Sequence, residues 1–252
     1  MNNIPTITFL PGLPVFGAFG KVETDYLIVF GENTKQEFIK NEIRDKEDMK
    51  KVLVLGCPRF DSLKSIEGED KKIIVYSLEI SQREHVMPEN HLTKKKQKEI
   101  LSWLFNIMKK IPDYHLILKT RPGWDMVGLP EKIAEENNFQ NFTVIEKTDN
   151  LRLLDSANLV IINMTTMGLE ALLLKKPVIS VTYKSMDALN PYKKLKIVKK
   201  AYTKEQLENA VKAGLKKKSK FSMQEVNKEI LVDGKATQRA VKLINKIFMG
   251  NK

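Results

Sequence analysis

The sequence predicts an α/β domain built on a doubly wound parallel sheet, and three observations carry this prediction. Its apolar runs are short, rich in Val, Ile and Leu, and continuous rather than alternating, which is typical of strands covered on both faces. Segments with helical periodicity lie between these runs. From residue 51 to residue 182 the two kinds of segment alternate, which favours parallel strands joined by right-handed helical crossovers.

The same patterns give the elements in order. Strands are expected at residues 4–10, 25–30, 51–55, 72–78, 114–119, 142–146, 158–163 and 177–182, with a weaker candidate at 195–198. Helices are expected at residues 32–40, 93–110, 129–138, 149–156, 166–175, 203–216 and 234–248. The helix at 93–110 has the clearest pattern, because Thr93 can cap its start while Ile100 and Leu104 share one face. The helices predicted from residue 203 onward should flank the sheet.

Composition excludes several classes of protein. The only cysteine, Cys57, excludes an internal disulfide and a cysteine-cluster zinc site. The three histidines are scattered, so we expect neither a metal site nor a bound cofactor. No long uncharged apolar stretch predicts a membrane-spanning helix, and the first residues lack the basic start of a secretory signal. A cytoplasmic location fits best, with peripheral contact at the inner membrane face as an extension of it.

The net charge of +12 is concentrated in one stretch. Residues 184–220 hold twelve lysines against three acidic residues. A solvated helical face is the simplest interpretation. A weak contact with an anionic membrane or an acidic polymer is the alternative. Nucleic acid is not expected as a partner, because no arginine or aromatic residues are interleaved with the lysines.

The most informative segment is residues 158–181, NLVIINMTTMGLEALLLKKPVISV. A buried strand ends there, and Thr165 and Thr166 then open a helix that carries Glu170. Ligands of open parallel sheets bind at the carboxyl ends of strands, where helix N-termini favour phosphate. The two hydroxyls add donors, and Glu170 lies one turn beyond Thr166, where it can accept hydrogen bonds from a ribose. The alternative is that Thr165 is only a helix cap and that Glu170 is solvated.

Two further loops follow predicted strands. Residues 114–125, YHLILKTRPGWD, place Arg121 after a strand, and an arginine there can bind phosphate with two donors. An ordinary exposed arginine is the alternative. Residues 77–91 supply Ser81, Arg83 and His85, a candidate loop over a substrate. The turn at residues 54–63 is interpreted as structural.

These segments together resemble the C-terminal, nucleotide-binding domain of GT-B glycosyltransferase-like proteins. The kin include CDP-glycerol glycerophosphotransferases, surface polysaccharide transferases and UDP-N-acetylglucosamine 2-epimerases. The resemblance rests on IPTITFLPG, DYLIVFGENTKQEFI, LGCPRFD, KTRPG, NMTTMGLEALLLKKPVI and VDGKATQRAVKLI. It implies a Rossmann-like sheet, half of a GT-B fold, with flanking C-terminal helices. It also implies a nucleotide- and phosphate-binding set made up of Arg121, Thr165, Thr166, Met167 and Glu170.

The sequence departs from this family pattern in two places. Pro11-Gly12 stands where the family has His-Gly, and Arg121 stands where it often has His. We expect residues 1–24 to be a crossover from an N-terminal domain that is missing from this chain, and residues 25–252 to form the donor-nucleotide domain. A partner chain that supplies the acceptor domain would complete the site.

The implied function is donor binding in a glycosyl- or glycerophosphoryl-transferase of cell-surface polysaccharide synthesis, with a nucleotide-sugar or CDP-glycerol as donor. One alternative is a nucleotide-sugar 2-epimerase, which needs several carboxylates in the cleft. Leu169 beside Glu170, in place of a second acid, counts against it. The other alternative is a nucleotide-binding subunit without catalysis.

Overall fold

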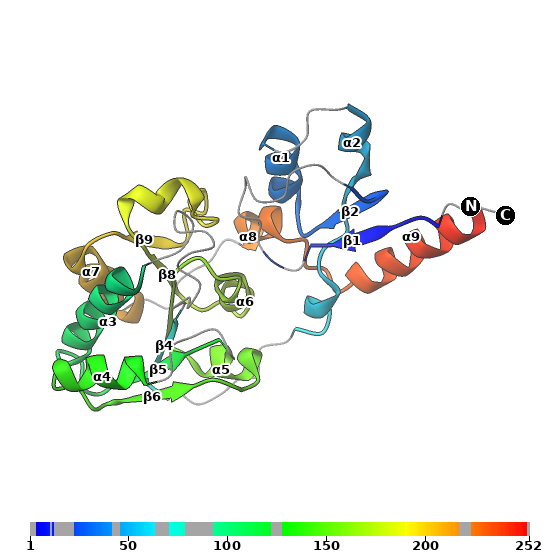
Figure 1. Cartoon of the computed structure of the whole chain (residues 1–252). Coiled ribbons are helices and arrows are strands. Elements are labelled where there is room, and N and C mark those ends of the chain that lie inside the picture. The colour runs from blue at the N-terminus through cyan, green and yellow to red at the C-terminus, as the bar shows by residue number, and fades with distance from the viewer. Residues whose placement is uncertain are drawn as a thin grey trace. The chain divides into compact units, whose positions relative to one another are not determined.

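The chain folds into two compact units in the computed structural model (Figure 1). The first unit joins both ends of the chain, Met1–Lys64 and Ser222–Lys252, and the second is Ser65–Phe221. We call them the end unit and the central unit. The structure describes residues 4–10, 12, 23–41, 46–63, 71–78, 93–121, 128–216 and 223–250.

The central unit contains a six-stranded sheet in which all strands are parallel. Its elements are β4 (Ile73–Ser77), α3 (Lys94–Met108), β5 (His115–Lys119), α4 (Leu129–Glu136), β6 (Phe142–Ile145), α5 (Asn150–Ser156), β7 (Leu159–Ile162), α6 (Met167–Leu173), β8 (Val178–Val181), the 3-10 segment η2 (Lys184–Leu189), β9 (Lys199–Ala201) and α7 (Lys204–Lys216). The strand order is β6-β5-β4-β7-β8-β9. Numbered within the unit this is 3-2-1-4-5-6, the order of a Rossmann-like doubly wound sheet. The predicted fold class is confirmed.

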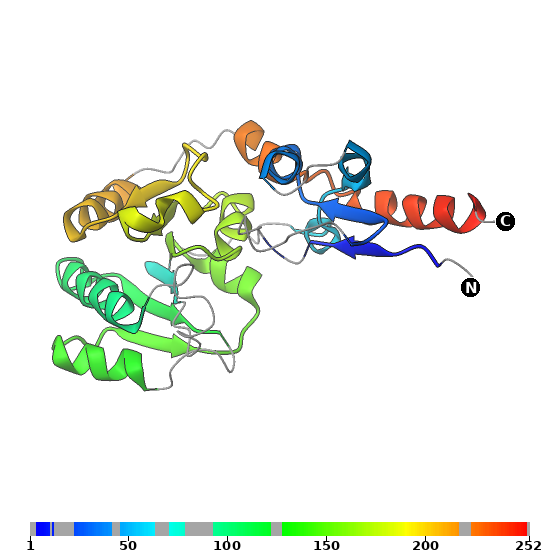
Figure 2. The same ribbon diagram turned by 45° about the horizontal axis from the view of Figure 1, so that its top comes forward.

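Helices cover both faces of this sheet. Figures 1 and 2 show α3, α4 and α7 on one face and α5 and α6 on the other, in agreement with the contacts of α3 with α4 and α7 and of α5 with α6. Central strands are therefore buried on both sides: Ile74, Val75 and Tyr76 are each 0% exposed. This two-sided burial is the physical reason why their sequence is continuously apolar.

The end unit contains a separate three-stranded parallel sheet in the order β1-β2-β3. Its elements are β1 (Ile7–Phe9), β2 (Tyr26–Val29), α1 (Glu32–Asn41), α2 (Lys46–Lys51), β3 (Val52–Val54), the 3-10 segment η1 (Pro58–Phe60), α8 (Met223–Glu229) and α9 (Ala236–Gly250). The division between units thus falls near residues 64 and 221, whereas the sequence analysis placed a boundary after residue 24. The role of residues 1–24 as a crossover stays a prediction.

The C-terminal segment packs in the end unit, where it contacts residues that are distant in the sequence. The amide of Leu231 donates to the Phe30 carbonyl at 2.9 Å, and Asn33 Nδ2 donates to Glu229 Oε1 at 2.7 Å. Gly31 permits this approach, because a Cβ there would lie 2.4 Å from the Glu229 backbone. The two helices predicted to flank the sheet therefore divide: α7 covers the sheet of the central unit, while α9 belongs to the end unit together with α8.

Element boundaries agree with the sequence patterns except at a few places. The weak strand expected at 195–198 is wrong in position, because β9 is formed by Lys199–Ala201. Two short helices, α2 and α8, were not expected. Helix α2 buries no residue, so its sequence has no apolar stripe to recognise. Within the described residues, no helix has the length and apolarity needed to span a membrane.

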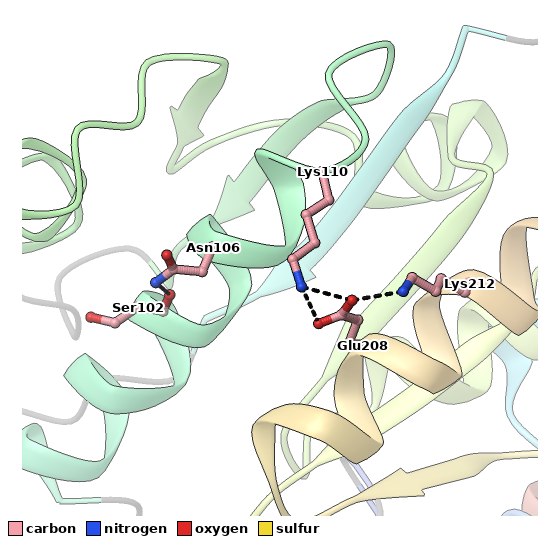
Figure 3. Close-up of polar contacts among 5 residues, drawn as sticks. All are labelled: Ser102, Asn106, Lys110, Glu208 and Lys212. Atoms are coloured by element: carbon pink, nitrogen blue, oxygen red, sulfur yellow. Dashed lines mark hydrogen bonds and ion pairs between the residues drawn. The ribbon is translucent and has the colours of Figure 1, made fainter.

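One carboxylate joins the two helices α3 and α7 (Figure 3). Lys110 at the end of α3 donates to both oxygens of Glu208 on α7, at 2.9 and 2.7 Å. Lys212, one turn along α7, donates to Glu208 Oε1 at 2.7 Å. The hydrogen bonds from Lys110 and then Lys212 lower the pKa of Glu208 from 4.5 to about 2.

A second carboxylate closes the end unit. Asp61 accepts hydrogen bonds from the amides of Ala236, at 2.9 Å, and Thr237, at 2.7 Å, and so caps the start of α9. Burial raises the pKa of Asp61, but the bonds from Thr237 and Ala236 outweigh it and lower the pKa overall. In the same corner Arg239 Nε donates to the Leu55 carbonyl at 3.0 Å. The turn at residues 54–63 is therefore structural, as the sequence analysis interpreted it.

We expect Glu208→Gln to lower the thermal midpoint of unfolding at pH 7. The depressed pKa means that the charged carboxylate stabilises the fold above pH 4.5 and that this stability is lost as pH falls toward 2. The difference in midpoint from wild type should therefore shrink between pH 7 and pH 3, measured by circular dichroism. Glu205→Gln, at an exposed position on the same helix, is the control. An equal deficit at both pH values would contradict the assignment.

We expect Asp61→Ala to destabilise the protein by about 1–2 kcal/mol, because two amides of the first turn of α9 lose their acceptor. Asp61→Asn keeps one acceptor oxygen and should cost less. Because the pKa of Asp61 is lowered in the folded state, the deficit of Asp61→Ala should also shrink as the pH falls. Urea unfolding at pH 7 measures the effect. Wild-type stability of Asp61→Ala would show that the cap contributes nothing.

Candidate functional site

The candidate site lies at the carboxyl edge of the sheet in the central unit, where strand order reverses. β4 and β7 are paired neighbours there, with Ser77 opposite Ile162. The chain leaves β4 toward α3 and leaves β7 toward α6, and these helices lie on opposite faces (Figure 1). A crevice at such a switch point is the usual ligand site of doubly wound sheets.

A fully buried amide, Asn163, lies directly after β7. The hydroxyl of Tyr76 lies 3.1 Å from its Oδ1, and Gln97 Nε2 donates to the same oxygen at 3.4 Å. Its Nδ2 donates to the Val181 carbonyl at 2.8 Å. Tyr76 lies on β4, Gln97 on α3 and Val181 on β8. One side chain thus ties three elements to the end of β7.

A second chain of hydrogen bonds runs from this point to the turn before α6. Ser180 Oγ donates to the Asn163 carbonyl at 3.1 Å and accepts from Asn190 Nδ2 at 3.0 Å. Asn190 Oδ1 accepts from the Tyr192 amide at 2.9 Å. The Tyr192 hydroxyl donates to the Thr165 carbonyl at 2.5 Å. The backbone at Thr165 is therefore fixed by a buried network that reaches β8.

Close packing fixes the start of α6 as well. A Cβ at Gly168 would lie 2.4 Å from Ile162 Cδ1 and 2.6 Å from the Tyr192 hydroxyl oxygen. Any larger residue here would force the side chains of Ile162 and Tyr192 to shift. Every residue of α6 is buried. The turn and the helix after it form one rigid piece at the end of β7.

The two predicted threonines flank the start of this helix. Thr166 is the N-cap residue but makes no side-chain capping bond, and Thr165 Oγ1 accepts from the Met167 amide at 3.4 Å. Both threonines are partly exposed, while Met167 is 7% exposed. The predicted helix start after a buried strand is confirmed. Phosphate binding by these residues stays a prediction.

Glu170 is only 5% exposed, so the alternative that it is a solvated helix residue is wrong. Its amide bonds the Thr166 carbonyl at 3.4 Å, one helical turn back. A buried carboxylate is costly unless it is compensated, so this residue is not an ordinary surface acid. Its proposed contact with a ribose is not tested by the structure.

The cations after β5 have different roles. Lys119 is 7% exposed and donates to the carbonyls of Thr120, at 2.6 Å, and Glu146, at 2.8 Å, so it ties the ends of β5 and β6 together. Arg121 is exposed at the same edge. β4 lies between β5 and β7, so two strand spacings, about 10 Å, separate Arg121 from the turn at Thr165. Both lie at the carboxyl edge of the sheet.

The remaining predicted residues, Ser81, Arg83 and His85, lie outside the described residues. Their segment follows Leu78, at the end of β4 and therefore at the switch point. Within the described ranges, no group of three or more His, Cys, Asp or Glu side chains is placed to hold a metal ion.

Sequence reasoning missed the groups that support the turn. Asn163 was seen only as the end of a strand, although a lone amide closing an apolar run is a signal for a buried polar contact. Tyr192 gave no signal, because nothing in its spacing connects it with Thr165. Tyr183, after β8, donates to Glu99, and burial and then this contact raise the pKa of its hydroxyl above the usual value.

A family model and several solved structures match this fold. The model described as UDP-N-acetylglucosamine 2-epimerase matches residues 24–245. No curated protein sequence matches the chain at a significant level. The UDP-GlcNAc 2-epimerase of Methanocaldococcus jannaschii, in complex with UDP-GlcNAc and UDP, is 20% identical with a TM-score of 0.61, and the match covers 88% of this chain and 61% of that one.

Two further similar structures are a polymerase and a 2-epimerase, the two kinds of protein that the sequence resembles. The wall teichoic acid polymerase TagF is 18% identical with a TM-score of 0.57, over 99% of this chain and 70% of that one. The UDP-GlcNAc 2-epimerase of Neisseria meningitidis, bound to UDP-GlcNAc, is 14% identical with a TM-score of 0.60, over 96% and 70%. At these identities the likeness shows the fold alone, and it confirms the predicted GT-B-like architecture.

The chain spans 61% of the Methanocaldococcus enzyme. The family model, by contrast, covers nearly the whole of this sequence, from residue 24 to residue 245 of 252. This chain belongs to the UDP-N-acetylglucosamine 2-epimerase family.

Proposed function

We propose that the central unit binds a nucleotide-activated donor, a UDP- or CDP-linked sugar or polyol, at the carboxyl edge between β4 and β7. The observation that carries this proposal is the rigid turn at Thr165 and Thr166, held by buried hydrogen bonds at the switch point of the sheet. A turn fixed before the ligand arrives loses little entropy on binding. Similar folds that contain UDP-GlcNAc or UDP support the proposal.

The proposed site uses neutral donors, a helix start and one exposed cation. The hydroxyls of Thr165 and Thr166 would donate to the diphosphate, and the partial positive charge at the start of α6 would favour it, with Met167 in the first turn. Arg121 would approach from the end of β5, across β4, at a distance suited to a bound group rather than to a direct contact. Glu170, buried one turn into α6, would accept hydrogen bonds from the ribose.

Two reaction classes follow from the same donor. Transfer of a glycosyl or glycerophosphoryl group to a surface polymer is favoured by the likeness to TagF. Inversion at carbon 2 of a UDP-linked sugar is favoured by the family model. Both need the diphosphate held in place, and in transfer the same donors would stabilise the leaving group without a bound metal. A nucleotide-binding subunit without catalysis is the third possibility.

Replacing both threonines, Thr165→Ala/Thr166→Ala, should weaken nucleotide binding at least tenfold, because hydrogen bonds to a charged phosphate contribute about 1.5–3 kcal/mol each at most. Calorimetry with UDP, UDP-GlcNAc and CDP-glycerol measures the loss and identifies the base. Thr143→Ala is the matched control: Thr143 lies on the edge strand β6, where its hydroxyl lies 2.8 Å from His115 Nε2, so its loss should leave nucleotide affinity unchanged. Absence of millimolar binding of any nucleotide to the wild type would refute the proposal.

We expect the purified chain to bind its donor without turning it over. The basis is Pro11-Gly12, which stands where the resembling family has His-Gly. Proton NMR of UDP-GlcNAc and CDP-glycerol incubated with the chain would detect epimerisation or release of the nucleotide. Robust turnover by the chain alone would contradict this expectation, and the product formed would decide between the two reaction classes.

A further inference from the structure

A cavity lies at the amino edge of the sheet in the central unit, opposite the candidate site. Its volume is about 400 Å³. It is lined by Leu159, Pro177, Val178, Ile179, Ile197, Lys199, Ala210, Ala213, Gly214 and Lys216. Leu159, Val178 and Lys199 are the first residues of β7, β8 and β9, which places the cavity where these strands begin. The other wall is the last part of α7.

Small residues on α7 explain why space remains there. Leu207 and Val211 of this helix are buried against the sheet. Gly214 brings the helix close to β7, because a Cβ at this position would lie 2.8 Å from Leu159 Cδ1. Ala210 and Ala213 are too short to fill the space beside it. The result is a groove with a buried floor, which includes Leu159, and a wall that reaches solvent at Ala213.

The charged side chains that line the groove in the described part of the chain are positive. Among the described residues that line it, the charged ones are Lys199 and Lys216, and both are exposed. They belong to the stretch 184–220, which holds twelve lysines against three acidic residues. The nearest acid along α7, Glu208, already accepts hydrogen bonds from Lys110 and Lys212. An apolar groove flanked by two exposed lysines complements a ligand with a hydrocarbon chain and an anionic head.

We propose that this groove binds the acyl chain of an anionic membrane lipid, with the lipid phosphate at Lys199 and Lys216. A cavity of about 400 Å³ lies within the range of small-molecule sites, which are mostly apolar with a few polar groups. Anionic bilayer surfaces attract lysines, and buried methylenes add affinity for a chain. The inference is independent of the proposed nucleotide site, because the two lie at opposite edges of the sheet.

Vesicle co-sedimentation tests the inference with the full chain. The wild type should bind vesicles of phosphatidylcholine and phosphatidylglycerol at low salt, bind less at high salt, and bind little to phosphatidylcholine alone. Ala210→Leu/Ala213→Leu fills the groove without changing charge and should lower binding at least tenfold. Circular dichroism checks that this variant is folded. Absence of wild-type binding to anionic vesicles, or unchanged binding by the folded groove-filling variant, would overturn the proposal.

A matched pair of charge variants separates the groove from the lysine-rich surface. Lys199→Gln/Lys216→Gln should weaken binding about tenfold or more, because each lysine at an anionic surface contributes about fivefold. Lys193→Gln/Lys204→Gln removes the same charge at exposed positions outside the groove and should change binding less than twofold. Equal losses of vesicle binding in the two variants would mean that the lysines act only as a diffuse surface charge. That result would overturn the proposal, and it does not depend on whether the groove-filling variant folds.

A soluble probe tests for insertion of the chain. Below their micelle concentrations, decyl phosphate should bind about fifteenfold more tightly than octyl phosphate, because each buried methylene contributes about fourfold. Inorganic phosphate should not bind at these concentrations. Equal affinities for the two alkyl phosphates would show that no chain enters the groove and would overturn the proposal. Nucleotide affinity should be the same in all groove variants, so a failure here is distinguishable from a failure of the nucleotide site.

Discussion

The carboxyl edge of the sheet depends on the burial of one amide, Asn163. A buried amide is stable only if its donors and acceptor have partners, and each bond it makes reaches a different element: β4 through Tyr76, α3 through Gln97 and β8 through Val181. Its own carbonyl accepts from Ser180, which begins the path to Tyr192. Moving any of these elements would leave buried polar groups without partners. The turn before α6 is therefore held in place by a network that makes no contact with ligand itself.

The two edges of the same sheet have opposite chemistry. β7 begins at Leu159, in the floor of an apolar groove, and is followed directly by Asn163, in a buried polar network. Four residue steps along a strand, about 13 Å, separate them. The strand between is completely buried and therefore rigid, so binding at one edge would leave the other unchanged. A protein that holds a soluble donor at one edge and a lipid at the other would keep its donor site close to the membrane.

Strands and helices can be predicted from local sequence patterns. Features that depend on contacts between residues distant in the chain cannot. β7 and the helix after it were predictable because two-sided burial produces a continuous apolar run that ends at a turn. The division into two units was not, since it depends on contacts such as that of Asp61 with Ala236, which lie 175 residues apart. The cations after β5 show the same limit: Lys119 and Arg121 are alike in sequence terms, yet one is buried among carbonyls and the other is exposed.

The structure removes the sequence argument against an epimerase. It rested on Leu169, which stands beside Glu170 where a second acid was sought. Leu169 is 1% exposed within α6, so its apolar identity is explained by packing and does not by itself report on the reaction. The residue thus does not discriminate between the two reaction classes. The proposed donor site is therefore compatible with both reaction classes.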